Sequence, residues 1–124
     1  MKTTIKLLFL STFFALNACS KNESTPDPTS AIVDKWWCDS NNVLASQYFK
    51  SDGTFEQGSK TGGTNNDKGK WSLSSDKKKI IITNVVGKTQ TLTNWEYELI
   101  SSSSNNLEMN FASFGIKMSM IVCP

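Results

Sequence analysis

The chain has 124 residues, with 13 basic and 11 acidic side chains and a formal net charge of +2. All the basic residues are lysines, and histidine is absent. The near balance of charge gives no reason to expect nucleic acid as a partner. The lack of arginine excludes bidentate phosphate clamps, and the lack of histidine excludes Ser-His and Cys-His dyads and the commonest metal ligand. We therefore expect no enzyme activity, no metal and no cofactor.

The first residues have the layout of a secretory signal peptide. Lys2 and Lys6 give it a positive start, and the apolar stretch over residues 7–16 is too short to span a bilayer. Residues 16–19, LNAC, resemble the lipobox of bacterial lipoproteins, which implies that residues 1–18 are removed and that Cys19 is lipidated. The alternative is an ordinary cleaved signal with a chance cysteine. Removal takes away two of the 13 lysines, so eleven basic residues balance eleven acidic residues in the mature chain.

Residues 19–31 are predicted to form the lipidated cysteine and a flexible tether, because residues 20–30 are rich in Ser, Thr, Pro, Asp and Asn and carry no hydrophobic side chain. Residue 20 is serine, whereas aspartate there is the usual signal for retention in the inner membrane. We therefore expect a lipid anchor in the outer membrane, on its periplasmic face or at the cell surface. Lys21 and Glu23 match a surface-export pattern only in part.

From Asp34 onward the chain shows short alternating runs separated by clusters of Gly, Asn, Ser and Asp, and no helical period of adequate length. The expected strands are residues 34–40, 45–50, 54–58, 70–74, 79–83, 89–100, 106–111 and 116–122. The Asp52-Gly53 step predicts a tight hairpin between the second and third strands. About eight strands in about 90 residues predict an all-β domain over residues 32–124, a small eight-stranded up-and-down antiparallel β-barrel.

The hydrophobic residues of the last three strands predict their register. The expected pairs are Leu99–Leu107, Tyr97–Met109, Trp95–Phe111, Phe111–Ile116, Met109–Met118 and Leu107–Met120. This register places Glu98 opposite Glu108, on the face that also carries Glu96, Asn110 and Lys117. Facing carboxylates suit a glycosidase pair or a hard-cation site. We expect a solvated outer face instead, because catalytic pairs sit in concave sites and this face is convex.

Cys38 and Cys123 lie near the two ends of the domain and are expected to form a disulfide in an oxidising compartment. The alternative is two separate buried thiols. Closure of the barrel would make the first and last strands neighbours, which is consistent with the bond. Simple alternation puts Cys123 on the outward face, so the bond requires either that Trp37 and not Trp36 points inward, or that a bulge intervenes.

Several hairpin motifs carry a resemblance to a known family. The runs KWW, YFKSDGTFEQG, GKWSLSSDKKKIII and TLTNWEYELISSSSNNLEMNF are similar to the lipocalin-like domain of small secreted bacterial lipoproteins, over Ile32 to about Ile121. The resemblance implies an eight-stranded barrel that holds a small apolar ligand, and it implies no catalytic residues. The chain departs from a true lipocalin in being shorter and in lacking the flanking helix.

The aromatic and methionine residues on the predicted inner face suggest a function. We expect a small hydrophobic or amphipathic ligand to be buried in the barrel against Trp71, Trp95, Tyr97, Met109 and Met118. The alternative for this set, which also includes Phe49, Phe55 and Phe111, is a filled core, because an eight-stranded barrel is just wide enough for its own side chains. The second function is a protein-interaction module, an inhibitor of hydrolases or an accessory subunit of an envelope complex, that docks through the polar loop 58–69.

Overall fold

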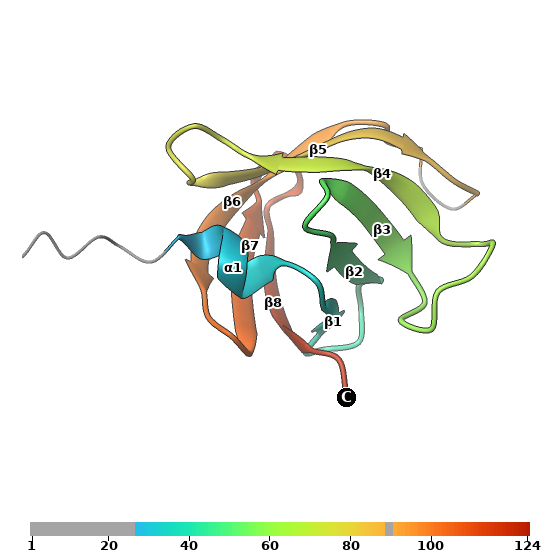
Figure 1. Cartoon of the computed structure of the whole chain (residues 1–124), viewed down its shortest axis with the longest axis horizontal. Coiled ribbons are helices and arrows are strands. Elements are labelled where there is room, and N and C mark those ends of the chain that lie inside the picture. Colours follow the sequence, from blue (N-terminus) through green and yellow to red (C-terminus); the bar gives the residue numbers. More distant parts are fainter. Residues whose placement is uncertain (1–26, 89–90) are drawn as a thin grey trace, which may run out of the picture.

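The structure is a computed structural model that describes residues 27–88 and 91–124 (Figure 1). The predicted signal peptide, Cys19 and most of the predicted tether lie outside the described residues. Among the described residues, no helix is both long enough and apolar enough to cross a membrane.

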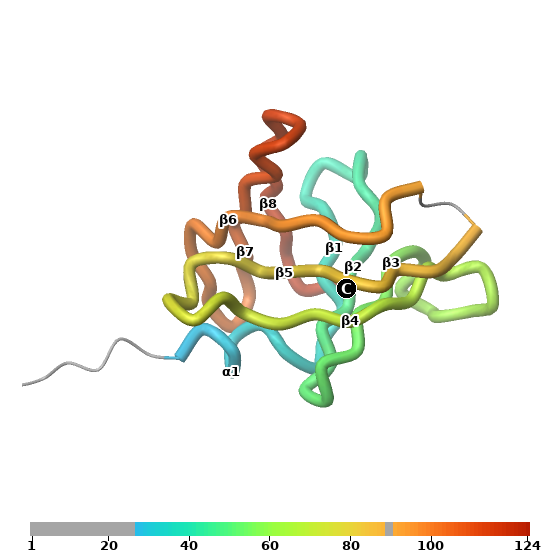
Figure 2. The backbone as a smooth tube through the Cα atoms, turned by 90° about the horizontal axis from the view of Figure 1, so that it is seen from above, coloured from blue at the N-terminus to red at the C-terminus, as the bar shows by residue number. Residues whose placement is uncertain are grey.

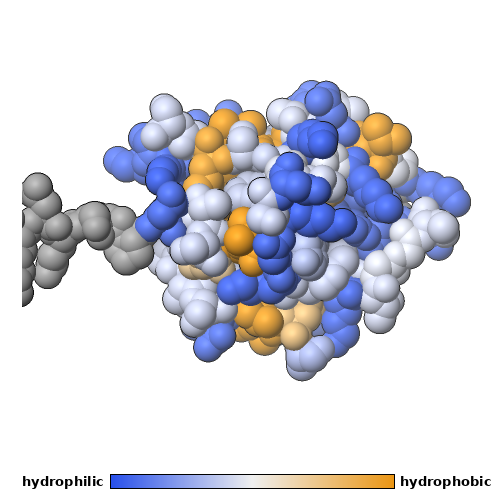
Figure 3. Space-filling model, in the orientation of Figure 1, coloured by the Kyte–Doolittle hydropathy of each residue, from blue (hydrophilic) through white to orange (hydrophobic). Residues whose placement is uncertain are grey.

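Eight antiparallel strands form one closed barrel, as predicted. They are β1 (Trp36–Asp39), β2 (Ser46–Phe49), β3 (Thr54–Gly58), β4 (Asp67–Leu73), β5 (Lys79–Val86), β6 (Trp95–Ser102), β7 (Asn106–Phe111) and β8 (Ile116–Val122). Each strand pairs with the next along the chain, and β1 pairs with β8 to close the barrel. Figure 2 shows β4, β5 and β6 running side by side. The space-filling view in Figure 3, which has the orientation of Figure 1, shows mostly hydrophilic side chains, with hydrophobic side chains in small separate patches.

A short helix, α1 (Pro28–Ile32), occupies the end of the segment for which the sequence predicts a flexible tether. Asp27 caps it by accepting a hydrogen bond from the Thr29 N–H at 2.9 Å, and Pro28 stands in the first turn, where its missing N–H costs nothing. Ile32 is fully buried in the barrel core. The helix escaped prediction because five residues are too few to show a helical period. In Figure 1, α1 lies beside β6 and leads into β1.

The predicted register of β7 and β8 is confirmed, with Leu107 opposite Met120 and Met109 opposite Met118. The predicted register of β6 and β7 is wrong by two residues, because Leu99 pairs with Met109 and not with Leu107. A shift of two residues keeps the same side chains inside, so alternation cannot detect it. A β-bulge between Leu99 and Ser101 then changes the pairing again, and Ile100, at this bulge, is exposed.

This register separates the two carboxylates that the sequence predicts to face each other. Glu98 pairs with Asn110, whose side-chain amide donates a hydrogen bond to Glu98 Oε2 at 2.9 Å. Glu108 accepts a hydrogen bond from the Ser119 hydroxyl at 2.7 Å. In the described part of the chain, no group of three or more His, Cys, Asp or Glu residues is arranged to hold a metal ion. The predicted Glu98–Glu108 pairing is therefore wrong.

The predicted disulfide between Cys38 and Cys123 is present, and its two Cα atoms lie 5.0 Å apart. Cys38 is in β1, and Cys123 follows β8 directly, so the bond ties together the two strands that close the barrel. Trp37 is the inward residue and is fully buried. Trp36 points to the other face, where its ring packs edge-on against Tyr48 at 5.2 Å between centroids.

β6 is shorter than predicted, since it begins at Trp95 and not at residue 89. The side chain of Asn94 accepts a hydrogen bond from the Asn84 N–H at 3.0 Å, and the Thr93 carbonyl accepts one from the Val85 N–H. Asn84 has a positive φ of 54°, a conformation that asparagine tolerates better than most residues. Residues 91–94 form a connection and not a strand.

Candidate functional site

The barrel interior is filled by its own side chains. The five residues predicted to bind a ligand in the lumen, Trp71, Trp95, Tyr97, Met109 and Met118, all belong to the core. The other buried hydrophobic residues of this core are Ile32, Trp37, Phe49, Phe55, Ile80, Ile82, Val85, Leu107 and Met120. The structure therefore brings the five predicted residues together in the barrel core, where they pack against other core side chains.

Aromatic rings run through the interior in contact with one another. The successive ring pairs are Trp71–Phe49, Phe49–Phe55, Phe55–Trp95, Trp95–Tyr97 and Tyr97–Phe111, with centroids 5.1–6.3 Å apart. Most of these pairs meet edge to face, which is a favourable geometry for aromatic rings. Together the rings occupy the space that the sequence suggested for a ligand.

A cavity of about 110 Å³ remains at the end of the barrel away from α1. We call this end, which is formed by residues 40–45, 59–66, 87–88, 91–94 and 112–115, the open end. The cavity is lined by Leu44, Ala45, Gln47, Gln57, Tyr97, Phe111, Ile116 and Met118. Pockets that hold drug-sized ligands have about 300–1,000 Å³, so this cavity is too small for the predicted ligand. Of the five predicted residues, only Tyr97 and Met118 line it.

Gln47 and Tyr97 form the polar part of the cavity wall. The Gln47 amide Nε2 donates a hydrogen bond to the Tyr97 hydroxyl at 3.0 Å, and both side chains are buried. Burial raises the pKa of Tyr97 to about 12, so the phenol is neutral at physiological pH. Gln47 is not among the residues predicted to bind a ligand. Gln47 lies two residues before Phe49, and residues two apart in a strand share a face, so the alternation could have placed Gln47 inside the barrel.

Exposed hydrophobic residues surround the mouth of this cavity. Val43 is 79% exposed, Phe114 57% and Ile116 38%, and we call these three residues the open-end patch. The ring of Phe114 packs on Phe111 at 4.7 Å between centroids, and both Phe111 and Ile116 also line the cavity. The patch is therefore continuous with the cavity wall.

Asp39 holds the loop that carries Val43 in place. Its carboxylate accepts hydrogen bonds from the N–H groups of Val43 at 2.8 Å and Leu44 at 3.0 Å, with a third from Asn41 at 3.3 Å. Burial by itself would raise the pKa of Asp39, but these three bonds outweigh it and hold the pKa below its usual value. The loop is thus organised around one buried charge.

The polar segment 58–69, predicted as a docking loop, is shorter and more ordered than the sequence suggests. β3 extends to Gly58 and β4 begins at Asp67, which leaves residues 59–66 as the connection. The buried Asn66 side chain accepts a hydrogen bond from the Ser59 N–H at 2.8 Å and donates to Glu56 Oε1 and to the Ser59 carbonyl, both at 2.9 Å. These bonds fix the base of the loop.

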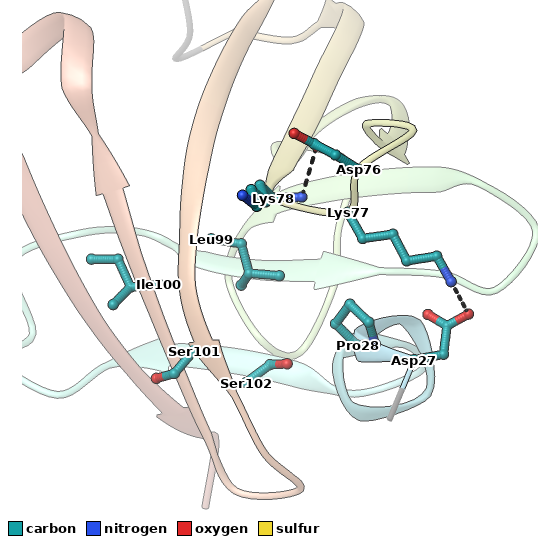
Figure 4. Close-up of a pocket in the computed structure, with 9 residues that line it drawn as sticks. All are labelled: Asp27, Pro28, Asp76, Lys77, Lys78, Leu99, Ile100, Ser101 and Ser102. Carbon is teal, nitrogen blue, oxygen red and sulfur yellow. Dashed lines mark hydrogen bonds and ion pairs between the residues drawn. The ribbon is translucent and has the colours of Figure 1, made fainter. Parts of the chain in front are cut away.

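A larger hollow of about 590 Å³ lies outside the barrel, between α1, the β4–β5 turn and the end of β6 (Figure 4). It is lined by Asp27, Pro28, Asp76, Lys77, Lys78, Leu99, Ile100, Ser101 and Ser102. Lys77 Nζ forms an ion pair of 2.6 Å with Asp27 Oδ2, and this bond lowers the pKa of Asp27. This groove could not be predicted from the sequence, because its residues come from α1, the β4–β5 turn and β6, which lie far apart in the chain.

Comparisons with known proteins support the fold and say nothing of activity. No protein-family model matches the chain, and no curated protein matches it either. A protein from Bacteroides uniformis ATCC 8492, solved by NMR, has a similar structure with a TM-score of 0.53 and 19% sequence identity. The aligned region covers 76% of this chain and 90% of that chain. At this identity the likeness shows the fold alone.

Proposed function

We propose that this protein is a lipoprotein of the bacterial envelope, anchored to the outer membrane through Cys19, and that its barrel is a protein-interaction module. The filled interior supports this function over a lumenal carrier. The family resemblance to lipocalin-like domains stays a prediction, and the barrel lumen is not where we place the binding function. Binding is assigned instead to the surface of the open end.

The distribution of exposed hydrophobic residues carries this proposal. In the described part of the chain, seven large hydrophobic residues are exposed: Val43, Val86, Leu92, Ile100, Phe114, Ile116 and Ile121. Val43, Leu92 and Phe114 lie in the connections of the open end, Val86 and Ile116 lie at the strand ends next to these connections, and Ile100 and Ile121 lie elsewhere. Exposed apolar side chains that gather at one place are typical of a protein interface.

Two connections that are consecutive around the barrel carry the open-end patch. Residues 40–45 and 112–115 are neighbours because β1 pairs with β8, and the Ser40 N–H donates a hydrogen bond to the Ser119 carbonyl at 2.9 Å. Figure 2 shows these two connections rising from the same side of the barrel. Val43 and Phe114 are thus both exposed on this side of the barrel, where one partner can contact them.

The anchor and the patch belong to opposite ends of the barrel. The chain enters the described part at Asp27, beside α1, whereas the patch lies at the end away from α1. Cys19 is eight residues before Asp27 in the sequence. A lipid on Cys19 therefore leaves the open-end patch accessible to a partner.

Site-specific photo-crosslinking in the bacterium that makes the protein tests this function. A photo-reactive amino acid replaces Val43, Phe114 or, as the matched control on the barrel wall, Ile121, which is 41% exposed. We expect one discrete larger species from positions 43 and 114 and none from position 121. No product at positions 43 and 114, or the same product at position 121, would overturn the proposal.

A second candidate function is the binding of an amphipathic ligand in the external groove. Its volume of about 590 Å³ lies in the range of small-molecule sites, and it combines the apolar Leu99 and Ile100 with the ammonium group of Lys78. Native mass spectrometry of the protein from its own envelope separates the two functions. An extra mass of a few hundred daltons that an Ile100→Trp variant loses would favour the groove. The mass of the lipidated mature chain alone, less two hydrogens for the disulfide, favours the interaction module.

A further inference from the structure

The cavity at the open end contains a buried polar atom without a partner. Gln47 is 2% exposed and lines the cavity, and its Oε1 atom has no hydrogen-bond partner in the described structure. Its Nε2 atom is already committed to the Tyr97 hydroxyl. Buried side-chain carbonyl groups are nearly always hydrogen-bonded, since leaving one unsatisfied costs free energy. Gln47 Oε1 can therefore accept a hydrogen bond from a group that enters the cavity.

The volume of the cavity limits the size of the group that can carry this donor. A volume of about 110 Å³ has room for about three or four water-sized groups. This is the size of a short side chain and not of a lipid or a cofactor. The hydrophobic side chains of Leu44, Phe111 and Met118 form much of the wall, which suits an apolar stem behind the donor.

The charge of the cavity limits the donor further. None of the residues that line it is charged at neutral pH, because its polar members are Gln47, Gln57 and the neutral Tyr97. Moving a charged group from water into such a space without a counter-ion is strongly unfavourable. A neutral hydroxyl or primary amide meets both requirements, since each donates a hydrogen bond and carries no charge.

We propose that the partner protein inserts one neutral side chain, ending in a hydroxyl or a primary amide, into this cavity, where it donates a hydrogen bond to Gln47 Oε1. This inference rests on the proposed function, because it assigns the donor to the partner that docks on the open-end patch. Ile116 belongs both to the patch and to the cavity wall, so a docked partner lies directly over the opening. An anchor side chain in a central pocket is a recurrent feature of protein interfaces.

Titration with side-chain mimics tests the cavity on the full chain. Propionamide and isopropanol are the neutral probes, and propionate and propylammonium are the charged controls. With methionine labelled at its methyl carbon, NMR reports on Met118 in the cavity wall, while the core residues Met109 and Met120 act as internal controls. We expect the neutral probes to shift the Met118 signal saturably, the charged probes to leave it unchanged, and the signals of Met109 and Met120 to stay in place.

A pair of matched variants tests the role of Gln47. Gln47→Leu should weaken binding of propionamide about tenfold, because it removes the acceptor in a buried site. Gln57→Leu makes the same change on the same wall at a partly exposed residue, and we expect less than a twofold effect. If Gln47→Leu fails to fold, as the Met109 and Met120 signals would show, Ala45→Leu narrows the cavity from the exposed loop and should weaken binding likewise.

The outcomes separate this inference from the proposed function. Crosslinking at positions 43 and 114 without any response of Met118 leaves the proposed function standing and overturns the cavity site, which then holds water only. Propionamide binding that is unchanged in both the Gln47→Leu and the Ala45→Leu variants also overturns the cavity site. A response of Met118 without crosslinking overturns the proposed function and, with it, the assignment of the donor to a partner protein, and identifies a free small molecule as the source.

Discussion

The indole Nε1 of Trp37 donates a hydrogen bond of 2.9 Å to the backbone carbonyl of Ile32, and both side chains are fully buried. This bond joins α1 to the first strand of the barrel. A helix of five residues has no stability of its own in water. Its position is therefore set by the burial of Ile32 and by this bond, which together close the end of the barrel opposite the open end.

Ile32→Ala should lower the free energy of unfolding by about 2–5 kcal/mol, because it removes buried methyl groups and leaves a void in the core. Urea unfolding followed by tryptophan fluorescence measures the change. Ser30→Ala, at an exposed position of the same helix, is the control and should have an effect within about 0.5 kcal/mol. A loss within about 0.5 kcal/mol for Ile32→Ala as well would show that the burial of Ile32 does not stabilise the barrel.

Reduction of the Cys38–Cys123 disulfide should destabilise the protein by roughly 4–5 kcal/mol. The bond joins residues 85 apart in sequence, and it restricts the unfolded chain more than the folded barrel, in which the two residues are already neighbours. Denaturant unfolding with and without a reductant measures the difference. A variant with both cysteines changed to serine should be less stable and insensitive to the reductant, and the same stability in all three samples would contradict the prediction.

Asp39→Asn should reduce stability at neutral pH and make it less sensitive to acid. The pKa of Asp39 in the folded protein is held below its ordinary value of 3.8, so its contribution is fully present above about pH 3.8 and is lost as the pH falls through the folded pKa. We expect the difference in melting temperature between the wild type and the variant to shrink as the pH is lowered from about 6 to 2. A constant difference over this range would show that the charge of Asp39 is not stabilising.

Tyr97 should make the protein less stable at alkaline pH. Burial raises its pKa from 10.0 to about 12, so between these values the unfolded state loses the phenol proton before the folded state does. Stability therefore falls as the pH rises from about 10 to 12, by up to about 2–3 kcal/mol. Tyr97→Phe should remove this part of the slope. In a Tyr48→Phe variant, which leaves Tyr97 as the single tyrosine, the tyrosinate absorbance should appear only near pH 12, and ionisation near pH 10 would contradict the prediction.

The local pattern of the sequence was sufficient to predict the strands and the barrel class. Period-two alternation gives each strand its inner face, as in the β7–β8 pair, where Met109 and Met118 are opposite each other as predicted. The disulfide between Cys38 and Cys123 followed from compartment, cysteine count and barrel closure together. The strand faces depend on residues close in sequence, and the disulfide depends on one topological constraint, the closure of the barrel.

What only the tertiary structure decided depends on distances between strands and on volume. The two-residue shift between β6 and β7 keeps the same faces, but it pairs Glu98 with Asn110 and so separates Glu98 from Glu108. Whether the aromatic set lines a cavity or fills a core is a question of volume, and the rings from Trp71 to Phe111 fill it. Gln47 Oε1 becomes a candidate site only because β2, β3, β6, β7 and β8 leave one small space beside it.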